Sequence, residues 1–107
     1  MNTENTINNT DTLALLRVAQ NHANQRDIAS SLGYSVGKVN YILKALIAKG
    51  FIKIENFSHS TNKKAYRYLL TEQGLKEKIV LTEKFIERKK HEYEELQKEL
   101  EAMRSCK

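Results

Sequence analysis

The stretch DIASSLGYSVGKVNYILKAL, residues 27–46, decides how this chain of 107 residues folds. Its first part has apolar residues at helical spacing, namely Ile28, Ala29 and Leu32. They predict a short helix over residues 25–32, which Gly33 ends as a left-handed cap. Ser35 is a good N-cap, so we expect a second helix from there to about Lys49. Two helices joined by such a turn are typical of a helix-turn-helix.

The second helix of this pair has an apolar face and a polar face. Its apolar residues are Val39, Ile42, Leu43, Leu46 and Ile47. The outer face is polar and basic in its N-terminal half, where a recognition helix reads base edges in the major groove of DNA. Asparagine pairs with adenine, lysine reaches guanine or phosphate, and tyrosine reaches phosphate. The residues expected to contact DNA are Ser35, Val36, Gly37, Lys38, Asn40, Tyr41 and Lys44. The alternative is two packed helices of an unrelated small α domain, against which the basic outer face and the Gly/Ser turn count.

After Gly50 the apolar pattern changes from helical to alternating. Residues 51–57 read as one strand, and residues from 63 or 64 to 70 read as another. A polar loop separates them, which predicts a β-hairpin. Such a hairpin can lay a basic tip along the minor groove or the phosphates, like a wing. The wing residues expected to contact DNA are His59, Lys63, Lys64 and Arg67. The alternative is a solvated loop with ordinary surface lysines. The aromatic residues expected to pack between strands and helices are Phe57, Tyr66 and Tyr68.

These elements predict a mostly α chain of the α+β class. The expected architecture is a winged helix-turn-helix of three helices and a β-hairpin, followed by a long C-terminal dimerisation helix. Thr10 or Asp11 is the expected N-cap of the first helix, which runs to about His22. Thr71 is the expected N-cap of the last helix, which runs to about Met103. The expected organisation is a flexible arm over 1–10, a DNA-binding domain over 11–71 and a coiled-coil helix over 72–107.

Positive charge is concentrated in the first two thirds of the chain. Residues 1–71 hold nine Lys/Arg and four Asp/Glu, whereas residues 72–107 hold nine of each. The net charge of +5 therefore lies in the first two thirds of the chain. This distribution favours an anionic partner.

Composition and motifs exclude several other classes of protein. No apolar run is long enough for a transmembrane helix, and the N-terminus has no signal-peptide pattern. A single cysteine, Cys106, predicts a reducing, cytoplasmic compartment. The three histidines are far apart and have no metal-ligand spacing. No catalytic triad, carboxylate pair or glycine-rich phosphate loop appears, so we expect no enzyme and no cofactor.

The last helix carries a seam at alternating spacings of four and three residues. The seam residues are Leu75, Ile79, Thr82, Ile86, Lys89, Tyr93, Leu96, Leu100 and Met103. Such a heptad pattern predicts a coiled coil, with the seven larger apolar residues as the dimerisation contacts. Pairing with a second copy is favoured over folding back on the domain. Thr82 and Lys89 can fix the register at a cost in stability. The pattern leaves parallel and antiparallel pairing open, and two Cys106 thiols can meet only in a parallel pair.

Two segments together carry a family resemblance. They are NQRDIASSLGYSVGKVNYILKALIAKGFI at 24–52 and YLLTEQGL at 68–75, in which Leu-Thr-x-x-Gly-Leu is typical. On them the chain resembles the winged helix-turn-helix regulators of the MarR superfamily over about residues 12–100. More narrowly, it is similar to the small MarR-type regulators associated with exopolysaccharide gene clusters. The resemblance implies a transcriptional regulator, and the residues identify no small-molecule effector.

We therefore expect a homodimer that binds double-stranded DNA at an inverted repeat. The competing hypothesis is a protein-interaction module, in which the winged helix and the coiled coil bind a different protein. A stable monomer with a partly unfolded tail would favour that alternative.

Overall fold

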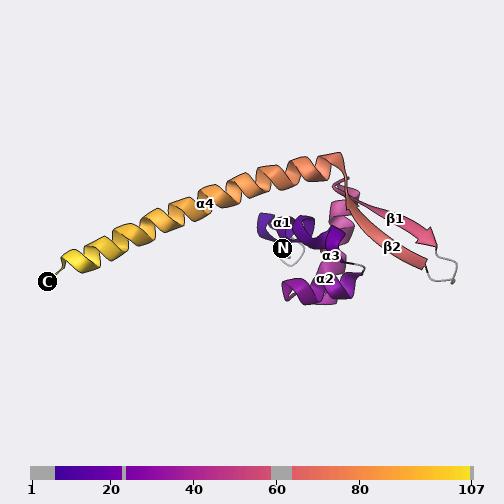
Figure 1. Ribbon diagram of the computed structural model, residues 1–107, viewed down its shortest axis with the longest axis horizontal. Coiled ribbons are helices and arrows are strands. Elements are labelled where there is room, and N and C mark those ends of the chain that lie inside the picture. Colours follow the sequence, from indigo (N-terminus) through magenta and orange to yellow (C-terminus); the bar gives the residue numbers. More distant parts are fainter. Residues whose placement is uncertain (1–6, 23, 59–63, 107) are drawn as a thin grey trace, which may run out of the picture.

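The computed structural model describes residues 7–22, 24–58 and 64–106, and its description excludes the side chains of residues 56–58 and 64–66. In chain order the elements are α1 (Asn9–Val18), the 3-10 turn η2 (Ala19–Asn21), α2 (Gln25–Leu32), α3 (Val36–Ala48), β1 (Ile52–Ser58), β2 (Lys64–Leu70) and α4 (Glu72–Ser105). Three short helices and a hairpin form a body at one end, from which α4 extends (Figure 1). The predicted fold class is confirmed.

The first helix differs from its prediction at both ends. Asn8, rather than Thr10 or Asp11, is the N-cap, because Asn8 Oδ1 accepts a hydrogen bond from the Asp11 amide at 2.7 Å. The helix also ends before the predicted His22, since η2 replaces its last turn. The expected arm over 1–10 is therefore too long, because its last two residues belong to α1. The first six residues lie outside the described part of the chain.

The core of the body draws on all three short helices, both strands and the start of α4. Its buried apolar residues are Leu13, Leu15, Leu16, Ala19, Ile28, Ala29, Val39, Ile42, Leu43, Leu46, Ile52, Tyr68 and Leu81. The predicted apolar faces of α2 and α3 are thus confirmed, although Leu32 and Ile47 are only half-buried. Tyr68 packs inside, as expected. Phe57 and Tyr66 lie outside the described side chains.

The two strands form the expected antiparallel hairpin. Ile52 lies opposite Leu70 at its base, and Ser58 lies opposite Lys64 towards its tip. The base is tied to the helices, because Gln20 Oε1 in η2 accepts a hydrogen bond from the Leu70 amide at 2.8 Å. The hairpin therefore projects from the body at a defined angle rather than hanging from a loose loop (Figure 1).

The start of α4 is fixed against the start of β1. Thr71 caps the helix as predicted, with its Oγ1 accepting a hydrogen bond from the Gly74 amide at 2.9 Å. The same hydroxyl donates to the Gly50 carbonyl, and the Thr71 amide donates to the Phe51 carbonyl at 3.0 Å. Gly74 lies directly on Phe51, so that a Cβ on Gly74 would overlap the Phe51 carbonyl. Only a glycine allows the helix to begin this close to the strand.

Beyond its first turns, α4 leaves the body. Leu81 is buried and Phe85 packs against the core, but every residue from 86 to 106 is exposed. The overall dimensions of 72 × 34 × 26 Å reflect this projection, as Figure 1 shows. Within the described ranges, no helix has both the length and the apolar content needed to cross a bilayer, although α4 has 34 residues.

Candidate nucleic-acid interface

The turn between α2 and α3 is held by caps on both sides. Asn24 Oδ1 accepts a hydrogen bond from the Asp27 amide at 2.8 Å at the start of α2. Gly33 ends that helix with a φ of 73°, a left-handed conformation that favours glycine. Ser35 Oγ then accepts from the Lys38 amide at 3.1 Å and starts α3. The predicted left-handed cap and N-cap are both confirmed, and they fix the direction of α3 relative to α2.

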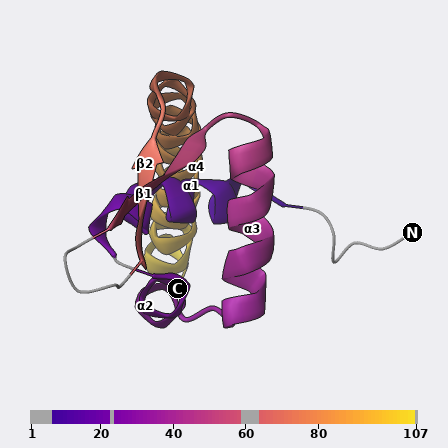
Figure 2. The same ribbon diagram turned by 90° about the vertical axis from the view of Figure 1, so that its right-hand side faces the viewer.

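The N-terminal half of α3 presents an open face. Val36 and Tyr41 are 45% and 40% exposed, and Lys44 is exposed one turn further along. Gly37 has no atom within 4 Å of the position that a Cβ would occupy, so another molecule can approach the backbone closely. Figure 2 shows α3 along one edge of the body. This face fits the width of a DNA major groove.

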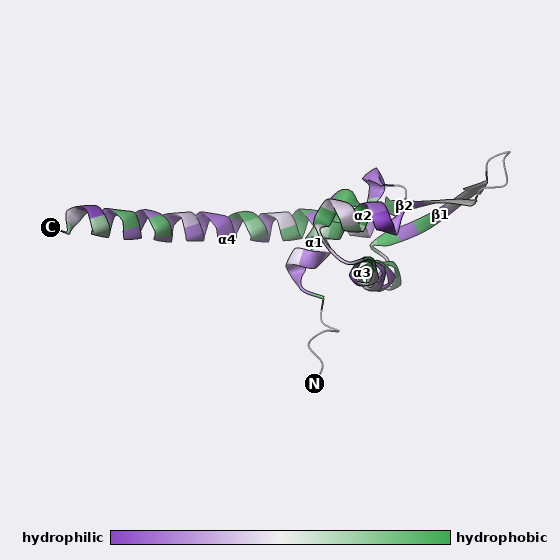
Figure 3. Cartoon of the chain, turned by 90° about the horizontal axis from the view of Figure 1, so that it is seen from below, coloured by the Kyte–Doolittle hydropathy of each residue, from purple (hydrophilic) through white to green (hydrophobic). Residues whose placement is uncertain are grey.

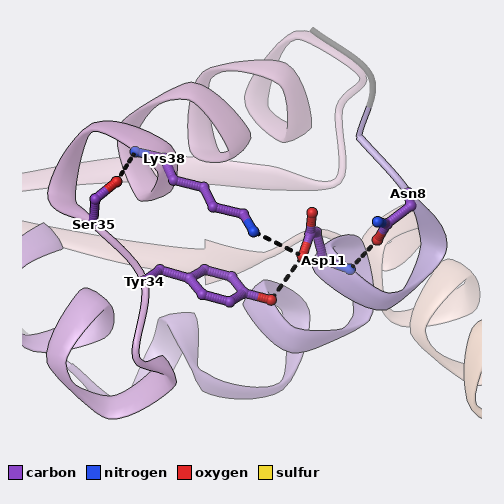
Figure 4. Close-up of polar contacts among 5 residues, drawn as sticks. All are labelled: Asn8, Asp11, Tyr34, Ser35 and Lys38. Atoms are coloured by element: carbon purple, nitrogen blue, oxygen red, sulfur yellow. Dashed lines mark hydrogen bonds and ion pairs between the residues drawn. The ribbon is translucent and has the colours of Figure 1, made fainter. Parts of the chain in front are cut away.

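Lys38 does not extend freely from this face. Its Nζ lies 3.5 Å from Asp11 Oδ1 and 4.0 Å from the centre of the Tyr34 ring (Figure 4). The Tyr34 hydroxyl donates a hydrogen bond to the same Asp11 oxygen at 2.7 Å. The Lys38 side chain is still 45% exposed, whereas that of Asp11 is 13% exposed. A phosphate or a guanine can therefore reach the ammonium, but it competes there with the carboxylate of α1.

The same cluster makes Tyr34 sensitive to alkaline pH. Burial, the hydrogen bond to Asp11 and the negative charge of that carboxylate, in this order, raise the pKa of Tyr34 to about 12 from its ordinary value near 10. A raised pKa means that the folded state prefers the protonated phenol. Its contribution to stability is therefore complete below pH 10 and is lost as the pH rises through 12.

We expect Tyr34→Phe to lower the free energy of unfolding by about 1 kcal/mol at pH 7, because one hydrogen bond is lost. The difference between wild type and variant should then shrink between about pH 10 and pH 12. Urea unfolding across this range measures it, with wild type and variant compared at each pH. A difference that stays constant with pH would contradict the raised pKa.

Asn40 is half-buried rather than fully exposed, because α2 holds its amide. Gln25 Nε2 donates a hydrogen bond to Asn40 Oδ1 at 3.1 Å. The carbonyl oxygen of an asparagine has a second lone pair, and its amino group has two donors. A bidentate contact with an adenine edge, which needs one acceptor and one donor, is thus compatible with the Gln25 bond. Gln25 restricts the rotamer of Asn40, so it is a positioning residue.

The hairpin residues are only partly covered by the structure. Arg67 is exposed on β2 opposite Glu55, and Lys64 begins the same strand. His59 and Lys63 lie outside the described residues, as does the side chain of Lys64. The strand register therefore places Lys64 nearer the tip of the hairpin than Arg67, but it does not test the individual contacts.

Comparison with known proteins identifies the architecture. Residues 11–53, which run from α1 into β1, match the family model described as winged helix-turn-helix DNA-binding. The fold is a winged helix-turn-helix. In this fold α3 occupies the position of the recognition helix, and the β1–β2 hairpin occupies that of the wing.

Solved structures share this winged helix together with the long helix that follows it. The transcriptional regulator SlyA has a TM-score of 0.60 at 24% identity, over 88% of this chain and 71% of the SlyA chain. A mutant of MepR from S. aureus has a TM-score of 0.59 at 27% identity, over 94% of this chain and 76% of that one. Another S. aureus MepR mutant, bound to an oligodeoxyribonucleotide, has a TM-score of 0.56 at 24% identity, over 91% and 75%. No curated protein matches the chain in sequence.

Three residues that belong to the candidate site could not be predicted as such from the sequence. Gln25 positions Asn40, which lies 15 residues further along the chain. Asp11 and Tyr34 position Lys38, which lies 27 residues from Asp11 and four residues from Tyr34. Only the contact between Tyr34 and Lys38 is local in sequence. An acidic residue in α1 and an aromatic residue in the turn are common at such positions and do not by themselves indicate a binding site. The sequence pattern marked Asp11 only as a helix cap and linked none of the three residues to the site, so only the packing of the helices shows what they do.

Proposed function

We propose that this chain is a MarR-type transcriptional regulator that binds double-stranded DNA sequence-specifically as a homodimer in the cytoplasm. The observation that carries the proposal is the open N-terminal half of α3, which presents Val36, Gly37, Asn40, Tyr41 and Lys44 at an edge of the body. The oligodeoxyribonucleotide bound to a MepR mutant of the same fold supports it. The net charge of +5, which lies in residues 1–71, supplies the attraction to phosphates.

The proposed contacts to DNA differ with the chemistry of each residue. Ser35 and the first backbone amides of α3 lie where a helix terminus favours a phosphate. Asn40, in the rotamer that Gln25 holds, reads a base edge. Lys38 gives up its ion pair with Asp11 when it contacts an anionic or acceptor group of the DNA. The net electrostatic gain from this contact is therefore smaller than for a lysine without an ion pair. The basic residues of the wing, Lys63, Lys64 and Arg67 with His59, add contacts to the phosphates or the minor groove.

The exposed seam of α4 supports the homodimer. Two recognition helices related by a two-fold axis read an inverted repeat with half-sites about one DNA turn, or a multiple of it, apart. A dimer that occupies a promoter changes the access of RNA polymerase. On the resemblance to regulators associated with exopolysaccharide clusters, we propose genes of exopolysaccharide biosynthesis as the targets.

Selection of the purified protein against genomic DNA fragments at near-physiological salt tests the proposal. An enriched inverted repeat is the expected result, upstream of exopolysaccharide genes if that part is correct. Enrichment of an inverted repeat upstream of other genes would refute the proposed target genes and leave sequence-specific binding intact. Salt-sensitive binding without an enriched motif would refute sequence-specific recognition and favour a role in binding another protein.

Asn40→Ala is expected to lower the preference for the operator over a mismatched site by about 10- to 100-fold, because a bidentate base contact contributes about 1–3 kcal/mol. Gln25→Ala should lower the preference less, since Asn40 keeps its amide and loses only its orientation. Both affinities are measured by fluorescence anisotropy on the operator and on a scrambled duplex. Equal losses of affinity on the two duplexes would show that Asn40 does not read a base.

Lys44→Ala and Lys64→Ala are each expected to weaken binding to all sequences alike and to reduce the slope of log K against log salt by about one. Lys98→Ala is the matched control, because Lys98 pairs with Glu95 at 3.6 Å far along α4. Binding isotherms at several salt concentrations measure the slopes. A slope unchanged in both variants would place the phosphate contacts elsewhere on the protein.

A further inference from the structure

The seam of α4 is an apolar face that the body leaves open. Its large apolar residues, Leu75, Ile79, Ile86, Tyr93, Leu96, Leu100 and Met103, are 43% to 62% exposed. Gly74, Leu81 and Phe85, which face the body, lie about a quarter turn away from the seam at 3.6 residues per turn. Figure 3 shows hydrophobic bands recurring along the whole projecting helix. A soluble protein rarely exposes so long an apolar stripe without a partner.

Charge is distributed unevenly along the same helix. Residues 76–90 hold six Lys/Arg and three Glu, a net of +3. Residues 92–101 hold five Glu and one Lys, a net of −4. One half of α4 is therefore basic and the other half is acidic. Two parallel helices in register would place the two acidic segments side by side, whereas two antiparallel helices can set each acidic segment beside residues 74–83 of the other copy, which hold two lysines and two glutamates.

We propose that two copies of α4 pair antiparallel, so that the dimer is a coiled coil with a winged helix at each end. This inference rests on the proposed homodimer and adds its orientation. The charge distribution favours it, because the acidic segment of each copy then lies away from the acidic segment of the other. The occupant of the seam is thus a second copy of this chain in reversed direction.

Lys89 favours the same orientation from within the seam. In a parallel pair in register, Lys89 would face Lys89 of the second copy, and two ammonium groups would be desolvated together. An antiparallel pair can instead set Lys89 against Ile86 of the second copy. There the aliphatic stem of Lys89 covers the isoleucine while its Nζ stays at the edge, 3.5 Å from Glu92 Oε1 and 5.2 Å from the centre of the Phe85 ring.

This register matches the remaining seam residues as well. When Ile86 lies opposite Lys89 of the second copy, the other opposing pairs across the seam are Leu75 with Leu100, Ile79 with Leu96, and Thr82 with Tyr93. At the flanks, Lys78 then lies beside Glu99 of the second copy, and Glu83 lies beside its Lys90. Every lysine and glutamate in these flanking pairs thus meets the opposite charge.

The orientation sets the distance between the two winged helices. At 1.5 Å per residue, antiparallel pairing in this register separates the two starts of α4 by about 45 Å along the axis. Parallel pairing would bring them to about 10 Å, the ordinary distance between packed helices. Half-sites one turn apart on DNA are about 34–36 Å from centre to centre. The antiparallel dimer therefore separates its two DNA-binding ends by a distance of the same order.

The native cysteine makes the test direct. Cys106 is the only cysteine of the chain, and it is exposed at the end of α4. A nitroxide spin label on Cys106 is expected to give an electron–electron distance of about 55 Å in the dimer, from the helical rise and the proposed register. A distance below about 25 Å would overturn the antiparallel orientation and leave the homodimer intact. Sedimentation equilibrium showing a monomer would overturn the homodimer and the orientation together.

Disulfide trapping tests the register in the Cys106→Ser background. Ile79→Cys combined with Leu96→Cys is expected to give covalent dimers on mild oxidation, because these two residues face each other across the proposed pair. They cannot join within one chain, since 17 residues of helix separate them by about 26 Å. Neither single variant should crosslink. Crosslinking by a single variant, or no crosslinking by the double variant, would overturn the proposed pairing.

Discussion

Gly74→Ala is expected to lower the free energy of unfolding of the winged helix by about 2–3 kcal/mol, or its Tm by about 10–15 °C. A Cβ at this position would overlap the Phe51 carbonyl oxygen and would lie 2.9 Å from the carbonyl carbon. The obstacle is backbone, so no rotamer change can relieve the overlap. The start of α4 would have to move, which would weaken the bonds that Thr71 makes to Gly50 and Phe51. Thermal and urea unfolding followed by circular dichroism measure the loss.

Gly37→Ala is the matched control for this substitution. It is also a helical glycine, but the space around it is empty to 4 Å. Alanine has the higher helix propensity, so this variant should be as stable as wild type or more stable by up to about 1 kcal/mol. On the proposed recognition face, the added methyl group should nevertheless change DNA binding. Equal stability of the two alanine variants would show that α4 does not rely on the close approach at Phe51.

Ile86→Glu combined with Leu96→Glu is expected to convert the dimer into a monomer and to weaken operator binding by at least about 100-fold. The double substitution places four carboxylates in the paired seam and removes apolar side chains that each contribute about 1.5–3 kcal/mol when buried. Loss of the second winged helix also removes the gain from binding two half-sites together, which is about 10²–10⁴. Both residues lie where α4 has left the body, so the winged helix itself should stay folded. Sedimentation and binding to half-site and full-site duplexes measure these effects.

His91→Glu combined with Ala102→Glu is the control, because it adds the same two charges per chain on the side of α4 opposite the seam. This variant should remain dimeric and bind the full site nearly as wild type does. If the seam variant stays dimeric, or if both variants dissociate alike, the seam is not the dimer interface.

The local structure of the helix-turn-helix could be predicted from sequence because it depends on neighbouring residues. The bounds of α2 at Gln25 and Leu32, the left-handed Gly33 and the Ser35 cap all follow from side chains within four residues of each other. The strands could be predicted for the same reason, since alternation reports which side of a strand is buried. The start of α1 was predicted wrongly, because several polar residues near Asn8 are equally suited to cap a helix.

Local patterns of residues thus predict most of the elements, their caps and the faces they bury. How the proposed recognition face is held depends instead on the tertiary packing. Asp11 meets Lys38, Gln25 meets Asn40, and Gly74 meets Phe51, each pair brought together from different elements. Helical and strand periods arise from backbone geometry within a few residues, so they are written in local patterns. Contacts across the fold depend on how whole elements pack, and no local pattern of residues records that.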